Sequence, residues 1–166
     1  PTYGLTLTNV GVLNNVSEGD AGGIYNITPM VASGLLVEGN RADANGGGLY
    51  NEGDSTVTNS TIRGNIAEGG GGLFATGSNT VTLSGTTINA NRAVGGGAVS
   101  GRSGVTINIT NSTLSGNLAR DVGAGFYHNG PASLNFATLA NNLSGADSDS
   151  AGSGINTFPS GWVLIA

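Results

Sequence analysis

The sequence predicts an all-β fold, a right-handed, single-stranded parallel β-helix of about six coils with roughly 25 residues in each coil. Three observations support this prediction. A motif with an aliphatic residue three positions before an asparagine recurs along the chain, glycine clusters lie between its copies, and the intervening segments alternate between apolar and polar residues. The recurring asparagines, which follow one another at nearly constant intervals, are Asn15, Asn40, Asn65, Asn91, Asn117 and Asn142.

A period of this length fits few other repeat architectures. A helical array would need stretches of about ten residues or more with 3.6-residue periodicity, and the glycine clusters would disrupt them. The signature of leucine-rich repeats is absent. Three short strands per unit remain, separated by corners rich in glycine and asparagine. A single coil cannot bury its apolar face, so we expect coils to stack about 4.8 Å apart and equivalent residues to form columns along the axis.

Each unit is expected to contain the same elements in the same order. The first strand alternates between inward and outward residues, as in Val57 and Thr58 or Leu83 and Ser84. The second strand contributes one inward aliphatic residue, and an asparagine corner and a glycine cluster follow. The asparagines are expected to occupy positive-φ corners, where asparagine is tolerated, and to hydrogen-bond from coil to coil. The aliphatic column is Val12, Val37, Ile62, Ile88, Leu114 and Leu139.

An apolar pair after each glycine cluster begins the third strand. By alternation, the second member of each pair points outward, so Tyr25, Tyr50, Phe74 and Tyr127 predict an aromatic stripe. Such a stripe binds sugar rings or packs against another chain, and coverage of the rings by a corner loop is an equally good interpretation. The pairs are Ile24-Tyr25, Leu49-Tyr50, Leu73-Phe74, Ala98-Val99 and Phe126-Tyr127.

The coils are expected to occupy residues 1–145, followed by a polar loop and an apolar C-terminal strand in residues 146–166. Such a strand is too apolar to lie free in water, so it should cover the last coil, pack along the aromatic stripe or insert into a neighbouring molecule. The polar run at 147–152 resembles the start of a calcium loop but lacks a third oxygen ligand and the glutamate, which favours a simple polar loop. The apolar residues of the tail are Trp162, Val163, Leu164 and Ile165.

The composition argues against several partners and activities. With five arginines, no lysine and a net charge of -5, the chain lacks a surface for nucleic acid or anionic membranes. It has no cysteine for a disulfide or thiol metal site, and no apolar run long enough to span a membrane. We expect neither a cofactor nor an enzyme, because no lysine base exists and no cluster of aspartate with arginine falls on one strand face.

Calcium is the one metal for which the sequence contains candidate ligands. Glu18, Asp43 and Glu68 each lie three residues after a column asparagine, so they could form a carboxylate stack. Like charges at coil spacing repel, which would invite Ca²⁺ or a neighbouring cation such as Arg41. The run is short, and a solvated acidic edge is the preferred interpretation.

The single histidine, His128, follows the last aromatic pair. The positions aligned with it have no fixed chemistry, so we expect a solvent-facing or corner residue rather than a catalyst or ligand. Those positions are Asn26, Asn51, Ala75 and Ser100.

The outward residues of the first strands resemble the Thr-x-Thr ladder that ice-binding solenoids present on a flat face. Threonine is also favoured in strands generally, so the pattern is compatible with a purely structural role. The pairs are Thr6/Thr8, Val31/Ser33, Thr56/Thr58, Thr82/Ser84, Asn108/Thr110 and Ser133/Asn135.

Two motifs carry a resemblance to a known family. Gly-Gly-Gly-Leu-Tyr-Asn at 46–51 and Thr-Ile-Arg-Gly-Asn-Ile-Ala at 61–67 alternate in a way that resembles the repeats of bacterial polymorphic outer-membrane adhesins and related secreted β-helix proteins. The resemblance covers roughly residues 5–145. It implies an extracellular or cell-surface location, and it leaves the role open because proteins of this kind include adhesins, lyases, phage spikes and structural fibres.

The sequence therefore favours a non-catalytic extracellular structural protein. Strand edges at the ends of the solenoid and the apolar tail, residues 162–166, predict head-to-tail assembly of identical copies into a fibre. A surface adhesin or carbohydrate-binding β-helix, with a polysaccharide or a host surface as partner, is the first alternative, and an ice-binding protein is the second.

Overall fold

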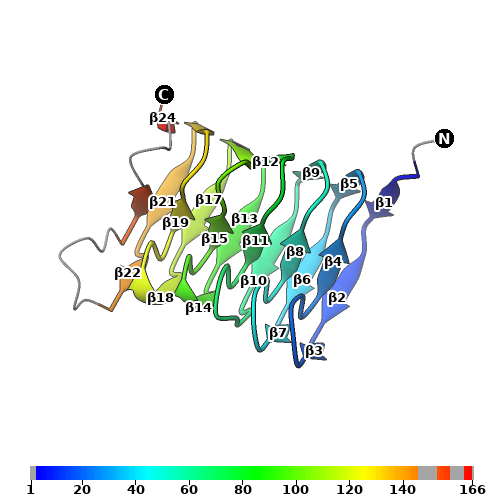
Figure 1. The fold of residues 1–166 in the computed structure, drawn as a ribbon, viewed down its shortest axis with the longest axis horizontal. Coiled ribbons are helices and arrows are strands. Elements are labelled where there is room, and N and C mark those ends of the chain that lie inside the picture. Colours follow the sequence, from blue (N-terminus) through cyan, green and yellow to red (C-terminus); the bar gives the residue numbers. More distant parts are fainter. Residues whose placement is uncertain (1–2, 146–152, 158–162, 166) are drawn as a thin grey trace.

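The structure, a computed structural model, describes residues 3–145, 153–157 and 163–165. It is an all-β parallel β-solenoid of about six turns, and the described residues include no helix. Each turn repeats the strand order of the one before it, with a period of roughly 25 residues. Successive turns stack along the long axis, so that β1 lies at one end and β23 and β24 at the other (Figure 1). The predicted fold class is confirmed.

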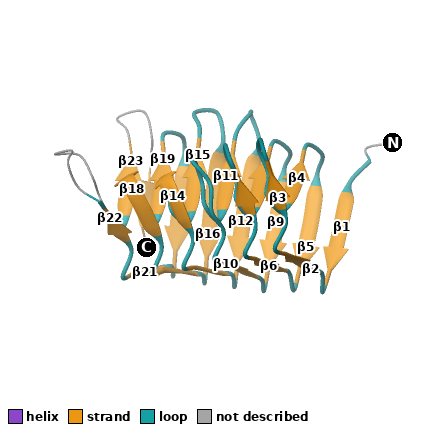
Figure 2. Ribbon diagram, turned by 90° about the horizontal axis from the view of Figure 1, so that it is seen from below, coloured by secondary structure: helices purple, strands orange, loops and turns teal. Residues whose placement is uncertain are grey.

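Three parallel sheets run along the solenoid and enclose its core (Figure 2). Sheet 1 contains β1 (Leu5–Thr8), β5 (Met30–Ser33), β9 (Ser55–Thr58), β12 (Thr80–Ser84), β16 (Thr106–Thr110), β20 (Ala132–Asn135) and β24 (Val163–Ile165). Sheet 2 contains β2 (Gly11–Leu13), β6 (Leu36–Glu38), β10 (Thr61–Arg63), β13 (Thr87–Asn89), β17 (Thr113–Ser115) and β21 (Thr138–Ala140). Sheet 3 contains β4 (Ile24–Asn26), β8 (Leu49–Asn51), β11 (Leu73–Ala75), β15 (Val99–Gly101), β19 (Phe126–His128) and β23 (Ile155–Thr157).

Short strands form a corner between sheets 2 and 3. The corner strands are β3 (Val16–Ser17), β7 (Arg41–Ala42), β14 (Arg92–Gly95), β18 (Leu118–Val122) and β22 (Leu143–Ser144). Strands β3 and β7 pair with each other, and β14, β18 and β22 form a second group. Single parallel bridges from Ile66 to Arg41 and to Arg92 join the two groups into one column.

The core follows the predicted inward columns. In sheet 1, Val57 and Leu83 are fully buried, whereas their neighbours Thr58 and Ser84 point outward. In sheet 2, the predicted aliphatic column is in register from the first turn to the last, with its four central members fully buried. Each buried aliphatic side chain of this size stabilises the fold by about 1.5–3 kcal/mol. The members of the column are Val12, Val37, Ile62, Ile88, Leu114 and Leu139.

The asparagine column lies inside the corner after sheet 2 and is bonded from turn to turn. In the middle of the column, Asn65 Nδ2 donates to Asn91 Oδ1 (2.9 Å), and Asn91 Nδ2 donates to Asn117 Oδ1 (3.0 Å). The same side-chain contact joins all six asparagines, so the predicted coil-to-coil bonding is confirmed.

The expectation that these asparagines themselves adopt positive φ is wrong by one position. The left-handed conformation belongs to the residue before each of them, for example Gly64 (φ 63°) before Asn65 and Ala90 (φ 54°) before Asn91. The bend at the preceding residue turns the asparagine side chain into the interior, where its amide reaches main-chain groups of the adjacent turn.

The C-terminal tail extends its own chain's sheets. Strand β23 pairs with β19 in sheet 3, and β24 pairs in parallel with β20 in sheet 1. Of the three placements considered for the tail, the structure shows coverage of the last turn, and it places β24 on sheet 1 rather than along the aromatic stripe of sheet 3. Val163, Leu164 and Ile165 form β24, whereas Trp162 and the calcium-loop-like run 147–152 lie outside the described residues.

Candidate functional site

The outward column of sheet 3 holds the aromatic residues singled out from the sequence. Tyr25 pairs with Tyr50 and Tyr50 with Phe74, and their rings stack with centroids 5.1 Å and 5.3 Å apart. Tyr127 occupies the same column two turns beyond Phe74. The structure therefore brings three of the four predicted aromatic residues into one stack and separates the fourth from it by one turn.

The fourth turn contributes Ser100 to this column. The predicted outward residue of that turn was Val99, and this prediction is wrong by one position because Val99 pairs with the inward Leu73 and is fully buried. The error arises because Ala98 takes the place of the third glycine of the preceding cluster: Leu49 N–H donates to the Gly72 carbonyl, and Leu73 N–H donates in the same way to the Ala98 carbonyl. The interval from Val99 to its partner Phe126 is one position longer than the interval from Leu73 to Val99, and a register shift between β14 and β18 accommodates that extra residue.

The aromatic stripe is open to solvent at its first ring and covered at the next two. Tyr25 is 55% exposed, whereas Tyr50 and Phe74 are only 8% and 4% exposed. Gly46 and Gly70, with φ of 69° and 58°, fold the preceding loop onto the start of each strand so closely that a Cβ would collide with it. The prediction of an exposed stripe is therefore wrong at Tyr50 and Phe74, which are covered by their stacked neighbours and by the loop that precedes each strand.

A groove of about 500 Å³ opens where Ser100 interrupts the column of rings. Phe74 and Tyr127 lie on either side of it, on strands two spacings, about 9.6 Å, apart. On the Phe74 side, the guanidinium carbon of Arg102 lies 5.4 Å from the ring centroid, in a cation–π contact. Glu68 lines the groove from the corner between sheets 2 and 3. The site thus combines an aromatic ring, a fixed guanidinium and a carboxylate around one opening.

Two of the five arginines line this groove, and they differ in their partners. Arg120 Nε donates to Asp121 Oδ1 (3.0 Å), and this bond, the Asp121 charge and, less strongly, the Glu68 carboxylate raise the pKa of Arg120. The ion pairs among the described residues leave Arg102 without a carboxylate within 4.0 Å. Within the described part of the chain, the Arg102 guanidinium therefore contacts a ring face and makes no ion pair.

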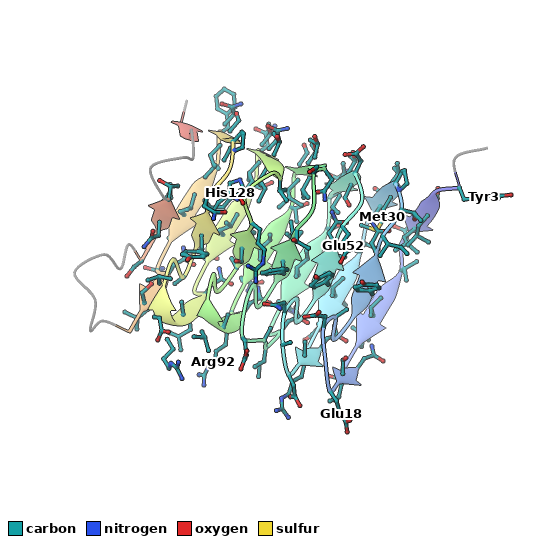
Figure 3. All side chains as sticks on the ribbon, viewed as in Figure 1. Tyr3, Glu18, Met30, Glu52, Arg92 and His128 are labelled. Atoms are coloured by element: carbon teal, nitrogen blue, oxygen red, sulfur yellow. The ribbon has the colours of Figure 1, made fainter. Side chains whose placement is uncertain are left out.

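The other end of the aromatic column is acidic. Tyr25 Oη donates to Glu52 Oε1 (3.3 Å), and Glu52 directly follows β8, the strand that carries Tyr50 (Figure 3). Burial, followed by the charges of Asp20 and Glu52, raises the pKa of Tyr50 to about 12. Charge therefore varies along sheet 3, with carboxylates beside the first two rings and arginines together with Glu68 at the groove.

His128 is fully buried, so the expectation of a solvent-facing or corner residue is wrong. It points inward because Phe126 and His128 alternate with the outward Tyr127, and its ring packs edge-on against Phe126 with centroids 5.7 Å apart. Its partner in the adjacent strand is Gly101, not Ser100, and the missing Cβ of that glycine leaves room for the imidazole. His128 Nε2 lies 3.1 Å from the Pro131 carbonyl oxygen, so the histidine belongs to the core and not to the groove.

The three candidate calcium ligands do not form a metal site. Asp43 makes an ion pair with Arg41 (2.7 Å), and Glu68 lines the groove described above. In the part of the chain that the structure describes, no group of three or more histidine, aspartate or glutamate side chains is placed to hold a metal ion. Glu18 and Arg92 mark the corner edge (Figure 3).

The outward residues of the Thr-x-Thr ladder lie on sheet 1 in the predicted register. Sheet 2 carries a second column of outward threonines, which was not predicted from the sequence. In sheet 2 an unbroken outward column of threonines crosses four successive turns. Its signal in the sequence is a threonine directly before the aliphatic column residue. The four residues are Thr61, Thr87, Thr113 and Thr138.

No protein-family model, curated protein or solved structure matches this chain, so no relative identifies its turns as adhesin repeats. None of the described residues forms a helix long and apolar enough to cross a membrane.

Proposed function

We propose that this chain is a non-catalytic saccharide-binding module of an extracellular or cell-surface protein, and that the groove at Ser100 is its binding site. The observation that carries the proposal is the gap of one ring in an otherwise continuous aromatic column. A pyranose ring is about as thick as the missing aromatic ring, and its C–H face stacks on an aromatic face. Tyr127 on one side of the gap supplies such a face.

Rigidity of the groove supports the same function. Its floor is β11, β15 and β19, which are hydrogen-bonded to one another and lie away from both ends of the solenoid. A site formed in advance loses little conformational entropy when a ligand binds, which suits recognition of flexible sugars. Polar groups that line the opening, such as Asn45 and Asn129, suit hydroxyl groups.

The acid content of the groove favours binding over hydrolysis. Glycosidic hydrolysis ordinarily uses two carboxyl groups on opposite sides of the bond that is cut. Of the described residues that line the groove, Glu68 alone carries a carboxylate.

The test is to fill the gap. Ser100→Phe should complete the aromatic column. Ser100 follows the positive-φ residue Gly96 (φ 67°) at the same distance as Tyr50 follows Gly46 and Phe74 follows Gly70, so its backbone has the conformation that holds a ring in the earlier turns. We expect the wild-type chain to bind members of an oligosaccharide array and Ser100→Phe to bind none, with an unchanged circular-dichroism spectrum.

Ser115→Phe is the matched control, since it adds the same ring to an outward serine on sheet 2, away from the groove. It should bind as the wild type does. Equal binding by Ser100→Phe and the wild type, or no binding by the wild type across the array, would reject the proposal.

A second candidate function is the head-to-tail assembly expected from the sequence. It is favoured by the first turn, where Leu5, Leu7 and Val12 are only half-buried against the core. Because β1 and β24 are the two edge strands of one parallel sheet, a copy that presents β24 to β1 of the next would continue that sheet in the same direction. Filaments in negative-stain electron micrographs would support assembly, whereas monodisperse particles at all concentrations would exclude it.

A further inference from the structure

We infer that the saccharide recognised at this groove is acidic, with a carboxylate that binds Arg102. The inference rests on the proposed function and adds the class of ligand to it. Uronate-containing oligosaccharides are the class that this chemistry fits.

Arg102 differs from the other arginine of the groove because it makes no ion pair among the described residues. Of the five arginines, Arg41, Arg63 and Arg120 each pair with a carboxylate, whereas Arg92 and Arg102 make no ion pair among the described residues, and of these two only Arg102 lines the groove. Arg102 lies on the face of Phe74. A guanidinium that lines a groove and makes no ion pair there can bind an anion.

Arg102 lies within the groove that a ligand would occupy. Its guanidinium carbon is 5.4 Å from the Phe74 ring centroid, and its side chain lines the same groove as Ser100 and Tyr127. A planar guanidinium donates two parallel hydrogen bonds to a carboxylate, a geometry that an ammonium group lacks. A sugar ring stacked on Tyr127 would present its carboxylate to this donor pair.

The two halves of the aromatic column differ in charge. Asp20 and Glu52 lie beside Tyr25 and Tyr50, so the first half is acidic and repels an acidic sugar. At the groove, Arg102 and Arg120 accompany Glu68 and Asp121, so the charges there balance. Because Asp121 pairs with Arg120, Arg102 is the cation of the groove that an acidic sugar would meet.

The test compares an oligogalacturonate with its methyl ester by isothermal titration calorimetry. The ester has the same sugar rings without the charges, so it separates ring stacking from recognition of the anion. We expect the acid to bind the wild type about 10- to 100-fold more tightly than the ester, which is the range of one charge-assisted hydrogen-bonded pair.

Arg102→Gln should remove this preference, so that the acid and the ester bind the variant with equal affinity. Arg63→Gln, which breaks an exposed ion pair with Glu38 on sheet 2, is the control and should alter neither affinity. Binding of acid and ester by the wild type with equal affinity, or an Arg102→Gln variant that keeps the preference, overturns this inference while the saccharide-binding proposal stands. A preference for sulfated over carboxylated oligosaccharides also overturns it. Absence of binding to acid, ester and every other sugar overturns the proposed function instead.

Discussion

Replacement of one asparagine in the middle of the column should destabilise the solenoid far more than replacement at its end. Asn91 is fully buried, and its side chain makes four hydrogen bonds. Its Oδ1 accepts from the backbone N–H (3.0 Å) and Nδ2 (2.9 Å) of Asn65, and its Nδ2 donates to the Ile62 carbonyl (3.0 Å) and to Asn117 Oδ1 (3.0 Å). Asn91→Ala removes all four bonds.

The cost comes from the main-chain groups that lose their partners. Asn91→Ala leaves the Asn65 N–H and the Ile62 carbonyl buried without these bonds, and each such group costs about 1–3 kcal/mol. We expect a loss of about 4 kcal/mol in the free energy of unfolding. At about 2–4 °C per kcal/mol for a chain of this length, the melting temperature should fall by about 8–16 °C.

The assay is chemical denaturation followed by circular dichroism, with Asn15→Ala as control. Asn15 is exposed, and its side chain makes one bond within the column, from Nδ2 to Asn40 Oδ1 (2.9 Å). That variant should lose less than about 1 kcal/mol. If Asn91→Ala were no less stable than Asn15→Ala, the column would not hold the turns together and the reasoning would be refuted.

Two further predictions concern strain and ionisation. Phe136 is 77% exposed and has φ of 51°, at a corner where the preceding turn has Asn111. Phe136→Asn should therefore raise the free energy of unfolding by about 1 kcal/mol, and Asn111→Phe should lower it by a similar amount; an unchanged melting temperature in both variants would contradict this. The pKa of Tyr50, raised to about 12 from an ordinary 10.0, means that the folded state holds its proton more tightly than the unfolded state. Its contribution to stability is complete below pH 10 and is lost as the pH rises to about 12, so Tyr50→Phe should flatten the decline of the melting temperature over that range; an identical decline in both proteins would count against it.

Periodic features of this protein follow from the sequence alone. A repeat of one strand–corner–strand pattern permits one stacked arrangement, so the aliphatic column and the asparagine bonds from turn to turn could be predicted from residue positions. Every unit adds evidence for the same column, and a single substitution such as Ala90 for glycine does not obscure it. The C-terminal strand was also predicted as a strand, and only its partner was left open.

Features that depend on one turn needed the tertiary structure. The sequence does not show that Ala98 takes the place of a cluster glycine, which decides that Ser100 faces outward. Nor does it place the extra residue between Val99 and Phe126, whose position decides that Gly101 lies beside His128. The depth of Tyr50 and Phe74 depends on loops that fold back from the same turn, and strand alternation gives the direction of a side chain but not what covers it. The repeat is a local property of the chain, whereas the groove forms where the repeat is broken, and the effect of a break is decided by packing between turns.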